Sequence, residues 1–343
     1  MKKQTKRYNM ILIGLILVLL VFIVVWKLQK REDLYFHVGI AVYDLGDSFI
    51  ESYIEELQEQ IEEHNIAGKK VSYEIYDARG ISTQQEKQLQ YMYAQEYDLV
   101  LVNLLEPSFA ARVLNELNES KTPVILFNRE VEEKDLEIKK DVWYVGTDAE
   151  AAGKIQAKML AQLWEKQQET VDKNQNGKIE YILVEGEESH YDTIRRTNGF
   201  LETSKELPLN QLQNLSADWK RELAFEKFAA LEEVMIQDTE VIICNNDDMA
   251  LGIYDYYKAN QLDVPVILGI NNSQEMNEKV LSGEIYGTVD NNVEDQVKKI
   301  DGLMRKVLEK NEADEPKIWY SEPYEIIKRK CPLRIENEEE KIR

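Results

Sequence analysis

Val38-Gly-Ile-Ala-Val-Tyr43-Asp-Leu-Gly-Asp-Ser-Phe49 joins a short apolar run to a polar loop, and residues 48–64 then follow with helical periodicity. An apolar, β-branched run of this length, bounded by turn residues, predicts a buried strand. Runs of the same kind alternate with longer amphipathic stretches from Tyr35 onward, which is the pattern of a parallel sheet covered by helices. The sequence therefore predicts an α/β fold.

The alternation of strands and helices occurs in two series. The predicted strands lie at residues 38–43, 71–76, 99–102 and 124–127 in the first series, and at residues 179–184, 241–244, 266–270 and 285–289 in the second. Two such series predict two similar Rossmann-like lobes with parallel sheets. A further helical pattern to about residue 310 and two short strand-like pieces, near Ile318 and at residues 324–327, complete the two lobes in turn. The chain is therefore expected to cross between the lobes more than once, in a multi-strand hinge.

These patterns give approximate boundaries for the lobes. We place the first lobe at residues 35–130 plus about 292–322, and the second at about 131–291 plus 323–335. The tail at residues 336–343 is rich in charge, which favours a solvated segment.

Residues 1–34 are expected to form a cytoplasmic N-terminus and a membrane anchor. Four basic residues precede an uninterrupted apolar run at residues 10–26, which is at the short end for a membrane-spanning helix. Neither a small-x-small cleavage site nor a nearby cysteine for a lipid follows the run, so an uncleaved single-pass anchor is favoured over a cleaved export signal. The leading basic residues predict that the rest of the chain lies on the extracytoplasmic face.

The composition excludes several classes of function. A formal net charge of −22 over 343 residues argues against nucleic acid or an anionic membrane surface as the partner. No glycine-rich nucleotide loop is present, and no Ser or Cys lies in a nucleophile-elbow context, so the sequence gives no support for an enzyme. The two cysteines, Cys244 in an apolar run and Cys331 in a polar tail, are expected to be free thiols.

Asp172-Lys-Asn-Gln-Asn-Gly-Lys-Ile-Glu180 matches nine of the twelve positions of a helix-loop-helix calcium loop. The twelfth position, where a bidentate glutamate should close the metal shell, is Leu183, and a predicted strand replaces the second helix. A closing carboxylate would therefore have to come from elsewhere in the chain. The alternative is a solvated Asn/Gly turn that leads into the strand.

Polar side chains, mainly Asn and Asp, follow the predicted strands. They lie at residues 44–49, 103, 128–130, 187–196, 245–248, 271–272 and 290–292. Ligands of open α/β sheets bind at these carboxyl ends of strands, although Asn and Asp also favour ordinary turns there. Planar Asp, Asn and Arg groups can each engage two adjacent sugar hydroxyls, and an aromatic ring can cover the apolar face of a sugar. Phe49 and Trp219 fit the aromatic role, and ordinary core packing is the alternative for both.

The chain resembles the galactose/glucose-binding proteins of the type I periplasmic sugar-binding class from Val38 to about Glu325. The shared strings are Asp47-Ser-Phe49, Val102-Asn-Leu-Leu-Glu-Pro107, Phe127-Asn-Arg-Glu130, Tyr144-Val-Gly-Thr-Asp148, His190-Tyr-Asp192-x3-Arg196, Trp219, Asn245-Asn-Asp247 and Gly287-Thr-Val-x-Asn291. The resemblance implies a periplasmic binding protein-like I fold with two lobes and a sugar pocket between them.

The resemblance also implies particular site residues. The expected sugar-binding side chains are Asp47, Phe49, Asn103, His190, Asp192, Arg196, Trp219, Asn246, Asn271 and Asn291. Asn271 departs from the aspartate of the family, so the hydroxyl preference at that position is open. The family has a calcium loop closed by a distant glutamate, and the corresponding structural Ca²⁺ ligands here are Asp172, Asn174, Asn176, the carbonyl of Lys178, Glu180 and Glu240.

We therefore expect a monomeric, extracytoplasmic receptor for a galactose- or glucose-like monosaccharide. Its lobes would close on the sugar and deliver it to the permease of an ABC importer. The alternative is a membrane-tethered sugar sensor that signals to a histidine kinase or another receptor. The uncleaved anchor is the feature that favours this alternative, because import receptors are usually free or lipid-tethered.

Overall fold

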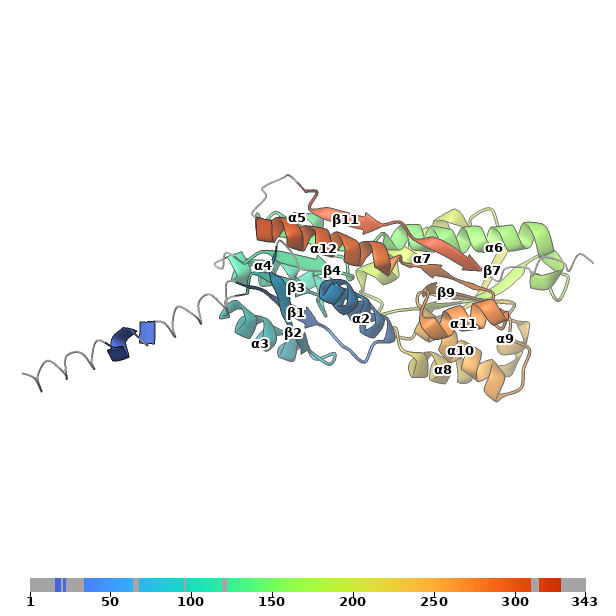
Figure 1. The fold of residues 1–343 in the computed structure, drawn as a ribbon. Coiled ribbons are helices and arrows are strands. Elements are labelled where there is room, and N and C mark those ends of the chain that lie inside the picture. The colour runs from blue at the N-terminus through green and yellow to red at the C-terminus, as the bar shows by residue number, and fades with distance from the viewer. Residues whose placement is uncertain are drawn as a thin grey trace, which may run out of the picture.

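The computed structural model describes residues 34–63, 68–95, 97–118, 122–309 and 315–327, together with residues 16–19 and 21–22. Most of the predicted membrane anchor lies outside these described residues, which include only 16–19, 21–22 and 34 of it, and the charged tail and Cys331 lie wholly outside them. Within the described ranges, no helix combines the length and apolar character needed to cross a membrane. Figure 1 shows two lobes side by side, each with a central sheet and covering helices.

The first lobe contains a six-stranded parallel sheet with the strand order β11-β5-β4-β3-β1-β2. Its strands are β1 (Tyr35–Val42), β2 (Lys70–Asp77), β3 (Leu99–Val102), β4 (Val124–Phe127), β5 (Val142–Thr147) and β11 (Ile318–Ser321). Its helical segments are α2 (Ser48–Glu63), α3 (Ser82–Tyr93), η1 (Pro107–Phe109), α4 (Ala110–Asn118), α5 (Glu133–Leu136) and α12 (Val293–Glu309). Both β3 and β4 are buried along their whole length, as expected for central strands of a parallel sheet.

The second lobe repeats this arrangement with the strand order β12-β10-β9-β8-β6-β7. Its strands are β6 (Ile179–Glu185), β7 (Leu209–Ser216), β8 (Val241–Cys244), β9 (Val266–Asn271), β10 (Gly287–Asp290) and β12 (Tyr324–Ile327). Its helices are α6 (Ala149–Val171), α7 (Tyr191–Thr203), α8 (Arg221–Ala229), α9 (Glu233–Asp238), α10 (Asp247–Ala259) and α11 (Gln274–Ser282). Only β12 is antiparallel, at the edge beside β10. The predicted two-lobe α/β fold is thus confirmed.

Three segments connect the lobes. The chain passes from β5 to α6, returns from β10 to α12, which packs on α2, and passes once more from β11 to β12. The expected end of the first lobe at residue 130 is wrong by one strand, because β5 belongs to the first sheet, where it pairs with β4 and β11. The strands expected from sequence do not include β5, and this is why the expected boundary falls too early.

Candidate functional site

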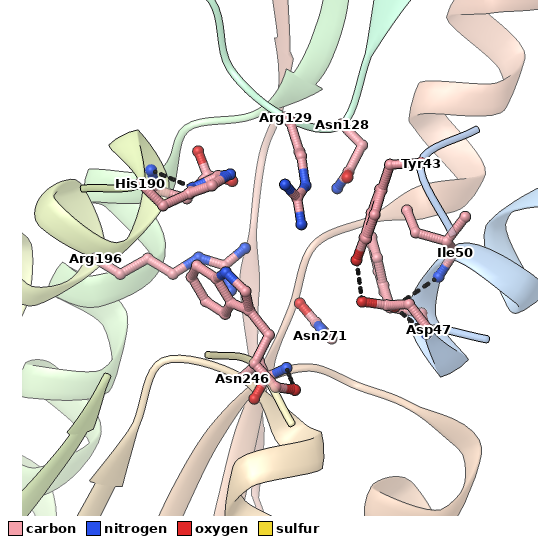
Figure 2. A pocket seen from close by; sticks show the side chains of 12 residues that line it. Tyr43, Asp47, Ile50, Asn128, Arg129, His190, Arg196, Asn246 and Asn271 are labelled. Atoms are coloured by element: carbon pink, nitrogen blue, oxygen red, sulfur yellow. Dashed lines mark hydrogen bonds between the residues drawn. The ribbon is translucent and has the colours of Figure 1, made fainter. Parts of the chain in front are cut away.

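A cavity lies between the carboxyl ends of the two sheets (Figure 2). Its lining comes from both lobes, at the ends of β1, β4, β6, β8 and β9 and in the loop before α8. The lining residues are Tyr43, Asp47, Phe49, Ile50, Asn128, Arg129, His190, Asp192, Arg196, Trp219, Asn246 and Asn271.

Asp47 lies in the turn between β1 and α2 and caps that helix. Its Oδ1 accepts hydrogen bonds from the main-chain N–H groups of Phe49 (3.0 Å) and Ile50 (3.1 Å), and its Oδ2 accepts from the Tyr43 hydroxyl. Burial, followed by the charge of Asp47, raises the pKa of Tyr43 well above its usual range. Tyr43 therefore stays protonated and remains a donor to Asp47.

Asn128 and Arg129 reach the cavity from the end of β4. Asn128 has a left-handed backbone (φ 66°), and its Oδ1 accepts a hydrogen bond from Asn103 Nδ2 (3.1 Å). The guanidinium carbon of Arg129 lies 3.7 Å from the centroid of the Tyr43 ring, and Nη1 donates to the carbonyl oxygen of Leu105. Stacking on Tyr43 and this bond hold the Arg129 cation at the cavity.

His190 and Arg196 come from the start of α7 in the second lobe. His190 caps the helix, with Nδ1 accepting from the main-chain N–H of Asp192 (3.2 Å). Burial lowers the pKa of His190 to about 4, against the opposing charge of Asp192, so the ring is neutral near pH 7. A neutral ring with an accepting Nδ1 carries its proton on Nε2, which is available as a donor. Arg196 Nη1 donates to the carbonyl oxygen of Asn245 (2.6 Å).

Trp219 lies in the turn before α8 with a left-handed backbone (φ 67°). Its ring meets that of His190 edge to face, with a centroid distance of 5.4 Å and an interplanar angle of 81°. Its carbonyl oxygen accepts from Asn246 Nδ2 (3.0 Å), while Asn246 Oδ1 caps α10 by accepting from the main-chain N–H of Met249 (3.0 Å). The main chain of Trp219 is thereby tied to the start of α10, and its ring lines the cavity.

Eight of the ten side chains expected from sequence line this one cavity. The two others lie one hydrogen bond behind it, because Asn103 donates to Asn128 and Asn291 Nδ2 donates to Asn271 Oδ1 (2.9 Å). Four lining residues were not among the expected sugar-binding side chains: Tyr43, Ile50, Asn128 and Arg129. Asn128 and Arg129 belong to the polar strand-end segment 128–130 noted in the sequence, but no sugar-binding role was assigned to them. The sequence context of Tyr43 and Ile50 is that of ordinary strand and helix residues.

Buried polar atoms without a partner cluster at this cavity. Within the described residues they include Asn103 Oδ1, His190 Nε2, Arg196 Nε, Trp219 Nε1 and Asn291 Oδ1. Buried polar groups are normally hydrogen-bonded, and leaving one unpaired costs about 1–3 kcal/mol. Both hydrogen-bond donors and hydrogen-bond acceptors at this cavity are therefore available to a polar ligand.

The lobes also touch beside the cavity. Ser48 Oγ of α2 donates to the carboxylate of Asp248 on α10, at 2.9 Å and 3.0 Å to its two oxygens. On another side, Arg195 Nη1 of α7 bonds Glu130 Oε1 of the first lobe at 2.5 Å. These contacts hold the two lobes closed over the cavity.

The sequence profile of the periplasmic binding protein domain matches residues 38–312. The chain belongs to this family. Periplasmic binding proteins are solute-binding proteins and not enzymes. Among curated members, the D-galactose/methyl-galactoside binding periplasmic protein MglB of Haemophilus influenzae is 28% identical over 285 residues, covering 82% of this chain and 84% of that protein. The ribose import binding protein RbsB of Bacillus subtilis is 23% identical, covering 76% of this chain and 77% of the relative.

Solved structures of periplasmic binding proteins share the fold. An ABC transporter solute-binding protein from Actinobacillus succinogenes with bound D-allose superimposes with a TM-score of 0.72 at 19% identity, covering 85% of this chain and 97% of its own. A galactofuranose-binding protein gives a TM-score of 0.73 at 19% identity, with coverages of 85% and 94%. The fold of the periplasmic binding proteins thus extends over both lobes.

Proposed function

We propose that this protein binds a galactose- or glucose-like monosaccharide between its lobes and delivers it to an ABC sugar importer. The observation that carries the proposal is the cluster of unpartnered buried donors and acceptors at a cavity lined by Phe49 and Trp219. A sugar supplies hydroxyls for the polar atoms and an apolar ring face for the aromatic groups. The names of the relatives, galactose and ribose binders among them, agree with this ligand class.

Sugar binding would stabilise the closed arrangement of the lobes. A ligand bonded to both Asp47 and Arg196 bridges the two lobes, and it therefore favours the closed form over an open one. The closed form would be the species that a permease recognises.

A thermal-shift panel tests the proposed ligand class. The full-length protein is melted with glucose, galactose, allose, ribose and myo-inositol, and with amino acids as the control class. The proposal expects at least one sugar to raise the melting temperature, because a ligand that binds only the native state stabilises it by mass action. A shift with an amino acid and with none of the sugars would refute the proposal.

A membrane-tethered sugar sensor is the second candidate, and the apolar run at residues 10–26 is the observation that favours it. Fractionation of cells that produce the full-length chain tests the tether. A sensor would stay in the membrane fraction after an alkaline wash, whereas a receptor released by signal cleavage would be soluble.

We also propose that the loop at residues 172–180 binds a structural Ca²⁺. The proposal is supported by the carboxylate of Glu240, just before β8, which accepts hydrogen bonds from the main-chain N–H groups of Lys173 (2.6 Å) and Glu180 (3.2 Å) and so lies against the loop. Three buried carboxylates, Asp172, Glu180 and Glu240, form no ion pair within the described ranges. They suit a hard cation.

The carboxylates alone do not make the site. Among the described residues, no group of three His, Cys, Asp or Glu side chains is arranged to hold a metal. The proposed ligand set therefore needs the amide oxygens of Asn174 and Asn176 and the carbonyl oxygen of Lys178 as well. All of these are oxygen donors, which Ca²⁺ prefers.

A further inference from the structure

Two arginines from opposite lobes point into the centre of the cavity. Arg129 follows β4 in the first lobe, and Arg196 lies on α7 in the second. Figure 2 shows both guanidinium groups directed into the space between Asn271 and His190. Their exposed fractions are only 5% for Arg129 and 7% for Arg196, so both cations are nearly withdrawn from water.

Neither of these cations forms an ion pair. No carboxylate oxygen of the described residues lies within 4.0 Å of a side-chain nitrogen of Arg129 or Arg196. Each side chain donates to one main-chain oxygen, that of Leu105 or of Asn245. A guanidinium has five N–H donors, and a buried charge without a close counter-charge is costly.

The carboxylates near the cavity act on these arginines only from beyond ion-pair distance. Both oxygens of Asp47 already accept hydrogen bonds from its own turn and from Tyr43. The charges of Asp192, Asp247 and Asp47 favour the cationic form of Arg196, but none of these carboxylates lies within 4.0 Å of its side-chain nitrogens. At the end of β9 the chain has the neutral amide of Asn271, which contributes no charge.

We propose that the bound monosaccharide carries a carboxylate, which Arg129 and Arg196 grip from the two lobes. A planar guanidinium fork matches a carboxylate in geometry as well as in charge, and two forks can share its two oxygens. The ligand class is then a sugar acid, either a hexuronate or an aldonate. This inference rests on the proposed function, because it assigns the ligand within the same sugar pocket.

Calorimetric titration of the unmodified, full-length protein tests the charge of the ligand. Galactose and glucose are compared with galacturonate and glucuronate, which differ from them at one carbon, and with gluconate. A sugar acid is expected to bind about tenfold or more tightly than the matched hexose. Equal or tighter binding of the hexose would refute the proposal that the ligand carries a carboxylate, and it would leave the proposed function intact. No binding of any of these sugars would overturn both.

Substitution of Arg129 tests the grip directly. Arg129→Gln is expected to weaken binding of the sugar acid by roughly a hundredfold and to change binding of a neutral hexose by much less. Arg129→Lys keeps the charge and loses the planar guanidinium, so its affinity for the sugar acid should lie between those of the unmodified protein and Arg129→Gln. Arg112→Gln is the matched control, since Arg112 is an exposed arginine of the same lobe paired with Glu86. An equal loss for acid and hexose in Arg129→Gln would show a structural role and refute the proposal.

Discussion

Trp219 reaches the cavity because a neighbouring glycine leaves room for its ring. A Cβ atom on Gly186 would lie 2.2 Å from ring atoms Cε2 and Cζ2 of Trp219, closer than any tolerable contact. The backbone of Trp219 is also held in place, because its main-chain carbonyl oxygen accepts a hydrogen bond from Asn246 Nδ2. The position of the Trp219 ring thus depends on Gly186, a residue with no side chain just after β6.

Gly186→Ala should therefore displace Trp219 and weaken sugar binding by tenfold or more, about 1.4 kcal/mol. Calorimetry measures the affinity, and circular dichroism checks that the fold persists. Gly302→Ala is the matched control, because a Cβ there meets nothing within 4 Å and α12 gains helix propensity. Unchanged affinity in Gly186→Ala would contradict the role given to Trp219.

A residue of the site could be predicted from sequence only where its type and its position both differ from those of a core residue. Asp47, Asn246 and Asn271 stand in polar turns after apolar runs, so their type and position both indicate a site at strand ends. Tyr43 ends an apolar strand, and its sequence context does not separate a cavity wall from core packing. Asn103 and Asn291 were expected in the pocket, but the structure uses them to orient Asn128 and Asn271.

The loop at residues 172–180 is an element with a testable role. If Ca²⁺ binds there, a chelator should lower the melting temperature of the protein by several degrees, because ligation that exists only in the native state stabilises it. Glu240→Gln should abolish the difference between calcium and chelator, while Glu233→Gln on α9 should leave it unchanged. Identical midpoints with calcium and with chelator in the unmodified protein would mean that the loop is only a turn.

A buried acid just after β4, Glu130, makes the stability of the folded protein depend on pH. Burial raises the pKa of Glu130 from its ordinary 4.5 to about 7, while bonds from Tyr320 and Arg195 act in the opposite direction. Between about pH 4.5 and pH 7, Glu130 therefore keeps its proton in the folded protein, whereas it releases this proton in the unfolded chain. Stability falls as the pH rises from about 4.5 to about 7.

Glu130→Gln should remove part of this pH dependence. The fall in melting temperature between pH 5 and pH 7.5 should shrink by roughly 2–4 °C, a change that corresponds to about 1 kcal/mol. Asp247 and Asp248, whose pKa values burial raises to about 7 and about 6, leave a residual slope of the same sign. Glu132→Gln, at an exposed neighbour, is the control. An unchanged fall in melting temperature between pH 5 and pH 7.5 in Glu130→Gln would contradict the role given to Glu130.

The elements that sequence patterns missed share a physical cause. Apolar strands such as β3 and β8 are buried on both faces, and their continuous runs are easy to recognise. In contrast β7 is the edge strand beside β6, is half-exposed, and has the polar sequence Leu-Asn-Gln-Leu-Gln-Asn-Leu-Ser. Its pairing with β6 decides its structure, and a single sequence does not display that pairing.

At the scale of the whole molecule, the two lobes meet over a cavity that neither could form alone. Arg129 and Asp47 come from one lobe, and Arg196 and Trp219 come from the other. The direct contacts of Ser48 with Asp248 and of Arg195 with Glu130 already favour closure. A bound sugar would add bonds across the same interface, which couples binding to the relative position of the lobes.

The central claim, that the cavity between the lobes holds a monosaccharide, is tested most directly by paired calorimetric titrations of the unmodified protein and of Trp219→Ala. Tyr191→Ala, which removes an exposed aromatic group outside the cavity lining, is the control. We predict one-to-one binding of a hexose or a hexuronate to the unmodified protein and to the control, and a loss of about 2 kcal/mol or more in Trp219→Ala. No heat of binding with any of these sugars, or equal affinity in Trp219→Ala, would contradict the claim.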